Sequence, residues 1–115
     1  MPGVEAHEGQ YKKNLRVVEI LRTSDNPPYD WIVTLYFYAA LHLVERALAK
    51  HNHHSTDHVN RNEKVRSPLF QKITPYYESL YIESQNARYE CVEMTLGKVK
   101  VAKSHLEAIE KQLLK

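Results

Sequence analysis

The sequence YDWIVTLYFYAALHLVERALAK, residues 29–50, decides how this chain folds. Apolar side chains occur on every side of a helix drawn through it, and such a helix is either buried or membrane-spanning. The longest uncharged run, 31–44, is too short to cross a bilayer. The β-branched residues Ile32, Val33 and Thr34 favour a strand, but the length and the alanine- and leucine-rich second half favour a helix. We therefore expect one buried central helix.

Breaks in the apolar pattern separate this segment from further helices. The double proline in 23–28 removes two backbone donors and ends the preceding helix. Threonine or serine before a helical stretch is a typical N-cap, which points to Thr56 or Ser55, to Thr74 before Pro75, and to Thr95. The other helices are expected at 10–22, 57–66, 76–84 and 95–114, with one further helical turn at 69–73.

Length and composition indicate a single domain. The chain has 115 residues, of which 43% are hydrophobic and 26% charged, which is ordinary for one globular unit. Only three glycines are present, too few for the turns of a β-rich protein. We predict a flexible leader over 1–9 and one domain over 10–115. Its fold class is expected to be all-α, an antiparallel (up-down) bundle of four to six helices around the buried central helix.

Cysteine content and charge limit the possible settings and partners. A single cysteine, Cys91, excludes an internal disulfide framework and favours a reducing, cytoplasmic location. No membrane partner is expected, since no signal-peptide pattern begins the sequence. The net charge of +2 is too small to argue for nucleic acid by itself. Any RNA-binding surface would have to come from local clustering of basic residues.

A polar stripe runs along the otherwise apolar central helix. Its members are spaced four, four and three residues apart, and they are Thr34, Tyr38, His42 and Glu45, with Arg46 beside them. Burying an unpaired polar group costs roughly 2–7 kcal/mol, so the stripe needs partners or a cleft. A pair between His42 and Glu45 would raise the histidine pKa. The alternative is structural: Thr34 bonds its own helix backbone, and the histidine and glutamate form a buried tether.

Two shorter clusters follow the central helix. His58 and Arg61 lie three residues apart on one face of the expected helix 57–66, where they could meet His42 and Glu45. The pair Arg88-Tyr89 falls in the expected connector before the last helix, from which it could reach into a cleft. The plainer interpretation is a solvated helix start and an ordinary loop arginine.

Histidines in the connector 51–58 raise the possibility of a metal site. His54 and His58 would be a suitable ligand pair if both lay on a helix. A helix cap at Ser55 or Thr56 interrupts that geometry, so no metal and no cofactor is predicted.

Three motifs, taken in order, resemble a subgroup of small HEPN-superfamily proteins. They are DWIVTLYFYAALHLVERAL at 30–48, TDHVNR at 56–61 and ARY at 87–89. The resemblance implies an antiparallel helical bundle, often a homodimer. The superfamily includes metal-independent endoribonucleases of toxin–antitoxin and defence systems, and also inactive binding or scaffolding modules. Its ribonuclease signature, an arginine followed by a histidine after four to six residues in the last helix, is absent here. After Arg88 the next histidine is His105, and the spacing from Arg46 to His51 or His53 falls at the wrong helix end.

Two functions are therefore expected as alternatives. The first is an RNA-binding protein or metal-independent endoribonuclease with the candidate catalytic residues His42, Glu45, His58, Arg61 and Arg88, and the candidate substrate-binding residues Thr34, Tyr38, Arg46 and Tyr89. In that mechanism His58 or His42 is the base, Glu45 orients the imidazole, and the arginines bind phosphate. The second is an inactive homodimeric interaction module, an antitoxin-type partner of a cognate protein.

Overall fold

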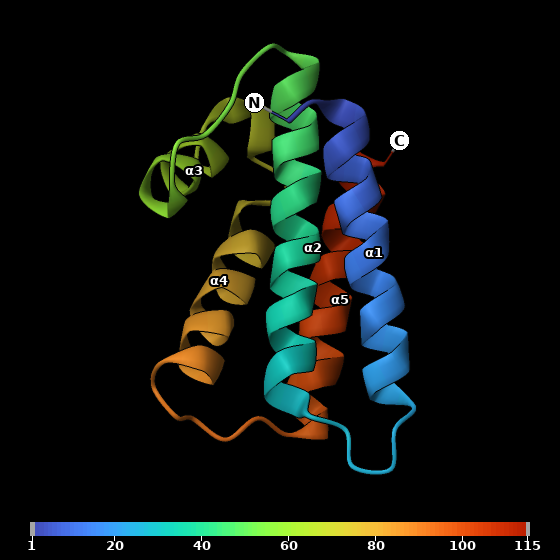
Figure 1. Ribbon diagram of the computed structural model, residues 1–115. Coiled ribbons are helices and arrows are strands. Elements are labelled where there is room, and N and C mark those ends of the chain that lie inside the picture. The colour runs from blue at the N-terminus through green and yellow to red at the C-terminus, as the bar shows by residue number, and fades with distance from the viewer. Residues whose placement is uncertain (1, 115) are drawn as a thin grey trace.

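The computed structural model describes residues 2–114 and is all-α, as predicted. No strand occurs within this part of the chain. The helices are α1 (Val4–Arg22), α2 (Tyr29–Lys50), α3 (His58–Val65), the 3₁₀ turn η1 (Pro68–Phe70), α4 (Thr74–Arg88) and α5 (Leu96–Leu113). Figure 1 shows α1, α2, α4 and α5 alternating in direction along the chain, with the short α3 packed at one end.

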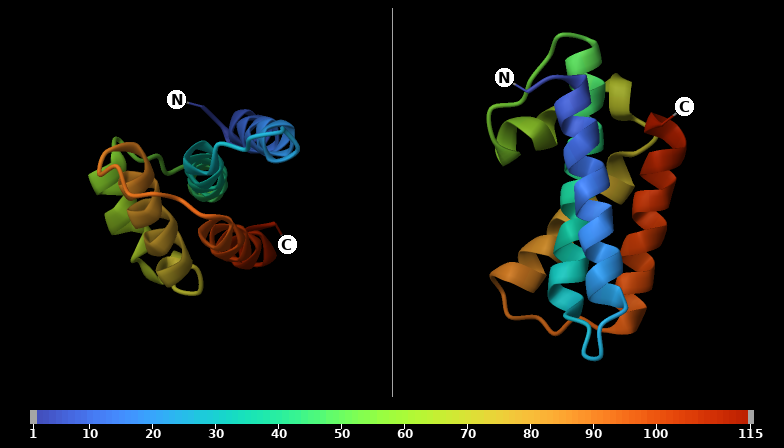
Figure 2. Two further views of the ribbon diagram at one scale, coloured as in Figure 1. Left: turned by 90° about the horizontal axis from the view of Figure 1, so that it is seen from below. Right: turned by 45° about the vertical axis from the view of Figure 1, so that its right-hand side comes forward.

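The central helix α2 is buried by its neighbours. It packs against α1, α4 and α5, and the end-on view of Figure 2 shows it between them. Phe37 and Ala39, which are two residues apart and therefore lie on nearly opposite sides of this helix, have no exposed surface. By length and composition α2 could cross a membrane, but two thirds of its most apolar window, 67%, is enclosed by the bundle. The sequence-based expectation of a buried central helix is confirmed.

The first helix begins earlier than expected. The prediction of a flexible leader over 1–9 is wrong for residues 4–9, because α1 starts at Val4 and His7 is buried; Met1 lies outside the described residues. His7 continues the apolar spacing of Tyr11 and Val18 by one more turn, so its burial extends the same packed face. This extra turn places the His7 ring next to His42 of α2.

The starts of α3 and α4 differ from the predicted caps, whereas that of α5 agrees with the prediction. Asp57, and not Thr56 or Ser55, caps α3, since its carboxylate accepts from the Asn60 backbone N–H at 2.8 Å. The Thr74 hydroxyl donates to the Val65 and Phe70 carbonyls and so joins α4 to the preceding turn. At α5 the predicted cap is confirmed: Thr95 accepts from the Lys98 N–H.

The fourth helix continues further than the sequence indicated. Residues 86–88 form its last turn, and α4 ends at Arg88. The prediction that Arg88 lies in a connector is therefore wrong. The consequence is functional, because a helix end holds the arginine in a more definite position than a loop would.

Candidate functional site

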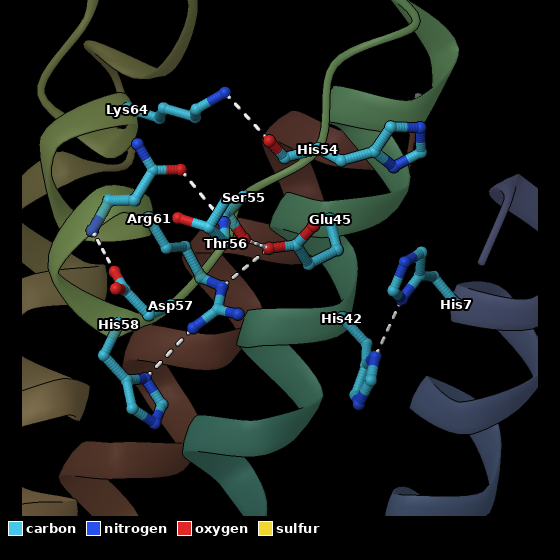
Figure 3. A network of polar contacts seen from close by, with 11 residues as sticks. His7, His42, Glu45, His54, Ser55, Thr56, Asp57, His58, Arg61 and Lys64 are labelled. Atoms are coloured by element: carbon cyan, nitrogen blue, oxygen red, sulfur yellow. Dashed lines mark hydrogen bonds and ion pairs between the residues drawn. The ribbon is translucent and has the colours of Figure 1, made fainter. Parts of the chain in front are cut away.

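A buried ion pair joins α2 to α3. Glu45, whose side chain is 6% exposed, accepts from Arg61 Nε at 2.7 Å, and the Ser55 hydroxyl donates to the same carboxylate oxygen. Figure 3 shows the three side chains meeting between α2, the connector and α3. Such a pair is stable only when its polar atoms are hydrogen-bonded, as here. Glu45 thus holds α3 in place, and its hydrogen bonds within the described chain do not reach His42.

Arg61, which pairs with Glu45, also determines which nitrogen of His58 carries the proton. Arg61 Nη1 lies 3.0 Å from His58 Nδ1, and arginine can only donate, so Nδ1 is the acceptor. Burial, followed by the charges of Arg61 and Arg88, lowers the pKa of His58 below its usual 6.5. The neutral ring therefore carries its proton on Nε2. His58 offers a hydrogen-bond donor to a ligand rather than a free basic nitrogen.

Two aromatic rings, one from α2 and one from α4, lie beside His58. The His58 ring centroid is 6.0 Å from that of Phe37 and 5.8 Å from that of Tyr81. These two rings hold the imidazole between α2 and α4 and reduce its contact with water. Of the expected grouping of His58 and Arg61 with His42 and Glu45, the structure brings together Glu45, Arg61 and His58, because Arg61 contacts both of the other two.

His42 does not join the Glu45–Arg61–His58 network but contacts α1. Its Nδ1 lies 3.0 Å from Nδ1 of His7 on α1, and Figure 3 shows its ring turned towards that helix. One ring must donate and the other accept, so at most one Nδ1 carries a proton in this contact. Burial, then the charges of His7 and Arg61, lowers the pKa of His42 to about 4, against a smaller opposite effect of Glu45. The predicted His42–Glu45 pair with a raised histidine pKa is wrong.

Arg88 at the end of α4 is surrounded by tyrosines. Its Nη1 donates to the Tyr38 hydroxyl at 2.5 Å, and its guanidinium carbon lies 5.2 Å from the Tyr38 ring centroid and 5.0 Å from that of Tyr89. The Ser84 carbonyl and hydroxyl accept from Nε and Nη2 at 3.2 and 3.3 Å. Among residues 2–114 no carboxylate forms a salt bridge with Arg88. Its positive charge is therefore held by neutral groups and is free to attract an anion.

The remaining candidates lie apart or have local roles. Thr34 donates to the Asp30 carbonyl at 2.8 Å, which is the backbone bond proposed as its structural alternative. Arg46 donates to the Leu113 carbonyl at 3.3 Å, and its Nε lies 3.9 Å from the Glu8 carboxylate. It joins α2 to the ends of α5 and α1, and is a link in the bundle.

The histidine-containing connector leaves α2 without forming a ligand cluster. Nowhere in 2–114 do three or more His, Cys, Asp or Glu side chains gather as a possible metal site. His54 contributes its carbonyl, which accepts from Lys64 Nζ at 3.0 Å. Its role in the described structure is to attach the connector to α3.

The predicted site thus divides into two. Glu45, His58 and Arg61 lie together, with Arg88 and Tyr38 on the same α2–α4 side, whereas His42 pairs with His7 towards α1. Sequence reasoning missed His7 and Ser55. The spacing of His7 from Tyr11 was a usable signal, since the interval of four residues continues the stripe of α1. Nothing local marked Ser55 as a partner of Glu45.

The fold and the site define an all-α bundle in which Arg88, without a salt-bridge partner among residues 2–114, lies between Tyr38 and Tyr89 where α2 meets the end of α4. Comparison of the chain with protein-family models, with curated proteins and with solved structures found no match.

Proposed function

We propose that this is a HEPN-like protein of the cytoplasm that binds single-stranded RNA at Arg88 and at His58, whose ring Arg61 orients. The observation that carries the proposal is Arg88, a cation fixed by two tyrosines and without a carboxylate partner in the described chain. A phosphodiester supplies the missing negative charge, and a charge-assisted hydrogen bond from arginine to phosphate is stronger than one between neutral groups. Exposed aromatic rings beside the cation suit unpaired bases.

Binding is favoured over cleavage by the state of His58. Metal-independent cleavage needs a base that removes the 2′-hydroxyl proton and an acid that protonates the leaving oxygen. His58 accepts from Arg61 at Nδ1 and presents Nε2–H, which donates to a phosphate oxygen. His42, the other candidate base, faces α1, and Glu45 is occupied by Arg61 and Ser55. We therefore expect RNA binding without rapid strand cleavage.

The proposal predicts that Arg88→Met weakens binding of a fluorescently labelled single-stranded RNA by about tenfold. The loss corresponds to one charge-assisted hydrogen-bonding group, and fluorescence anisotropy at fixed salt measures it. Arg16→Met is the matched control, because it removes the same charge from an exposed position on α1. Incubation of the labelled RNA in EDTA with the parent and with His58→Ala tests cleavage in parallel. Equal affinity of the two arginine variants, or no binding by the parent, would refute the proposal.

A second candidate function, a homodimeric interaction module, is favoured by a different surface. A groove of about 500 Å³ lies between α4 and α5, and its lining includes the buried residues Leu80 and Ala102 as well as Val101 and His105. Val101 is exposed there, and the Tyr76 ring lies beside His105, with ring centroids 5.6 Å apart and ring planes tilted by 50°. Exposed apolar side chains beside a groove are typical of a protein–protein contact. A second copy of the chain is the proposed occupant, in line with the HEPN resemblance, and a cognate protein partner is the alternative.

For this second candidate we expect Val101→Glu to raise the dimer dissociation constant by at least about tenfold, because an unpaired charge would enter an apolar contact. Sedimentation velocity over a concentration series measures the change. Ile20→Glu introduces the same charge at an exposed apolar position of α1 and serves as the control. A parent that stays monomeric at all concentrations would exclude the dimer.

A further inference from the structure

A small pocket lies where the first turn of α2 meets the end of α4. It has a volume of about 260 Å³, and its lining residues are Asp30, Trp31, Thr34, Ala87, Arg88 and Tyr89. Ligand pockets for drug-sized molecules begin at roughly 300 Å³. The space is therefore suited to one flat ring system rather than to a larger ligand. Arg88, the cation of the proposed RNA surface, forms part of its wall.

Two aromatic side chains of this pocket are exposed without any role in the core. Trp31 is 56% exposed although it belongs to the most buried helix of the bundle, and Tyr89 is 64% exposed. Large aromatic rings in contact with water lose the stabilisation that burial would provide. A bound planar base would cover them, and stacking of one base on an aromatic side chain contributes about 1–3 kcal/mol.

The acidic residue of the pocket gives it a chemical preference. Asp30 is exposed, its backbone carbonyl accepts from Thr34, and among residues 2–114 its carboxylate has no hydrogen-bond or ion-pair partner. An ionised carboxylate only accepts hydrogen bonds and has two oxygens side by side. Guanine presents two adjacent donors, N1–H and the N2 amino group, on its Watson–Crick edge. Adenine, cytosine and uracil each present one donor group on that edge, next to at least one acceptor that the carboxylate would repel.

We propose that this pocket receives a guanine base of single-stranded RNA. The base stacks against Trp31 and Tyr89, its donor edge meets the Asp30 carboxylate, and the adjoining phosphate lies at Arg88. The inference rests on the proposed RNA-binding function and adds base selectivity to it. A free guanine nucleotide has the same chemistry as a guanine within RNA, so the test includes both.

The test compares four labelled oligouridine RNAs that differ only at one central position, which is G, A, C or U. We expect the G-containing RNA to bind the parent at least about tenfold more tightly than the A- and C-containing ones, the discrimination typical of one bidentate contact. Asp30→Asn should reduce this ratio to near one, since an amide offers one acceptor instead of two. Asp25→Asn, in the α1–α2 turn, is the matched control for the loss of an exposed acid and should keep the ratio.

Trp31 provides a second readout, because it is the only tryptophan of the chain. Stacking of a guanine should quench tryptophan fluorescence more strongly with the G-containing RNA than with the others. GMP used alone should quench it with weaker affinity than the RNA does. If free GMP binds and the RNA does not, the site is a nucleotide site and the proposal is overturned. Trp31→Ala should weaken binding of the G-containing RNA by at least about tenfold, whereas Tyr76→Ala, at the far end of α4, should not.

The outcomes separate this inference from the proposed function. RNA binding without base preference, or a preference that survives Asp30→Asn, overturns the guanine pocket and leaves RNA binding at Arg88 standing. Failure of the parent to bind any of the four RNAs overturns both.

Discussion

Replacing Glu45 with alanine is expected to lower the free energy of unfolding by about 3–5 kcal/mol, the cost of removing one partner from a buried ion pair. The remaining Arg61 side chain is 13% exposed and would stay between α2 and α3 without a counter-charge. The Ser55 hydroxyl would lose its acceptor as well. Urea denaturation of the parent and the variant, followed by circular dichroism, measures the difference.

Two further variants determine whether the buried charge is the cause. Arg61→Ala added to Glu45→Ala should cost less than the sum of the two single changes by about 1–3 kcal/mol, because no orphaned charge is left. Glu19→Ala is the matched control: its contact with Arg22 has nearly the same length, 2.8 Å, but is exposed on α1. Exposed ion pairs contribute little, so this change should fall within the scatter of surface substitutions. Similar losses for Glu45 and Glu19 would contradict the argument from burial.

The contact between His7 and His42 is expected to make the fold sensitive to mild acid. The unfolded chain takes up a proton at His42 near pH 6.5, whereas in the folded chain burial lowers this pKa to about 4. Between these values the unfolded state binds more protons, so stability falls as the pH falls. From pH 7 to pH 5 we expect His42 to account for a loss on the order of 1–2 kcal/mol. The pKa of His7 is also lowered, mainly by burial, so His7 acts in the same direction.

The change in the free energy of unfolding between pH 7 and pH 5, compared among variants, separates the contribution of His42 from that of the carboxylates. Urea melts at pH 7 and pH 5 give the change in free energy of unfolding for the parent and for His42→Gln. The variant should lose the His42 part of the pH dependence whatever its stability at pH 7. His51→Gln, which removes an exposed histidine just after α2, should retain the parent's slope. A slope that is the same in all three proteins would exclude the His7–His42 contact as the acid-sensitive element.

Elements with a strong local signal were predictable from the sequence. The bounds of the central helix agree with the prediction, because the double proline before it and the loss of apolar residues after it are local events. Thr95 was identified as a cap for the same reason. The start of α1 and the end of α4 were not predicted, since α1 begins at Val4 and α4 continues to Arg88. Tertiary packing of His7 and the contacts of Arg88 favour continued helix there.

The candidate site was predictable as a set of side chains but not as an arrangement. His58, Arg61, Arg88 and Glu45 were chosen for their chemistry and spacing, and the first three lie on one side of the bundle. The sequence did not indicate that Arg61 pairs with Glu45 or that His42 has a histidine partner 35 residues earlier. Those pairings depend on the distance between helices, which the spacing of residues along the sequence does not reveal.

Local chain properties alone determined that this protein is a helical bundle around one enclosed helix, since periodicity and proline position act over a few residues. Only the tertiary structure decided which polar groups of that helix are neutralised and which remain open to a ligand. The free energy of a buried polar or charged group depends on the partner that reaches it. Thr34 finds its partner within α2, but the partners of Tyr38, His42 and Glu45 come from other segments: Arg88 from α4, His7 from α1, Arg61 from α3 and Ser55 from the connector.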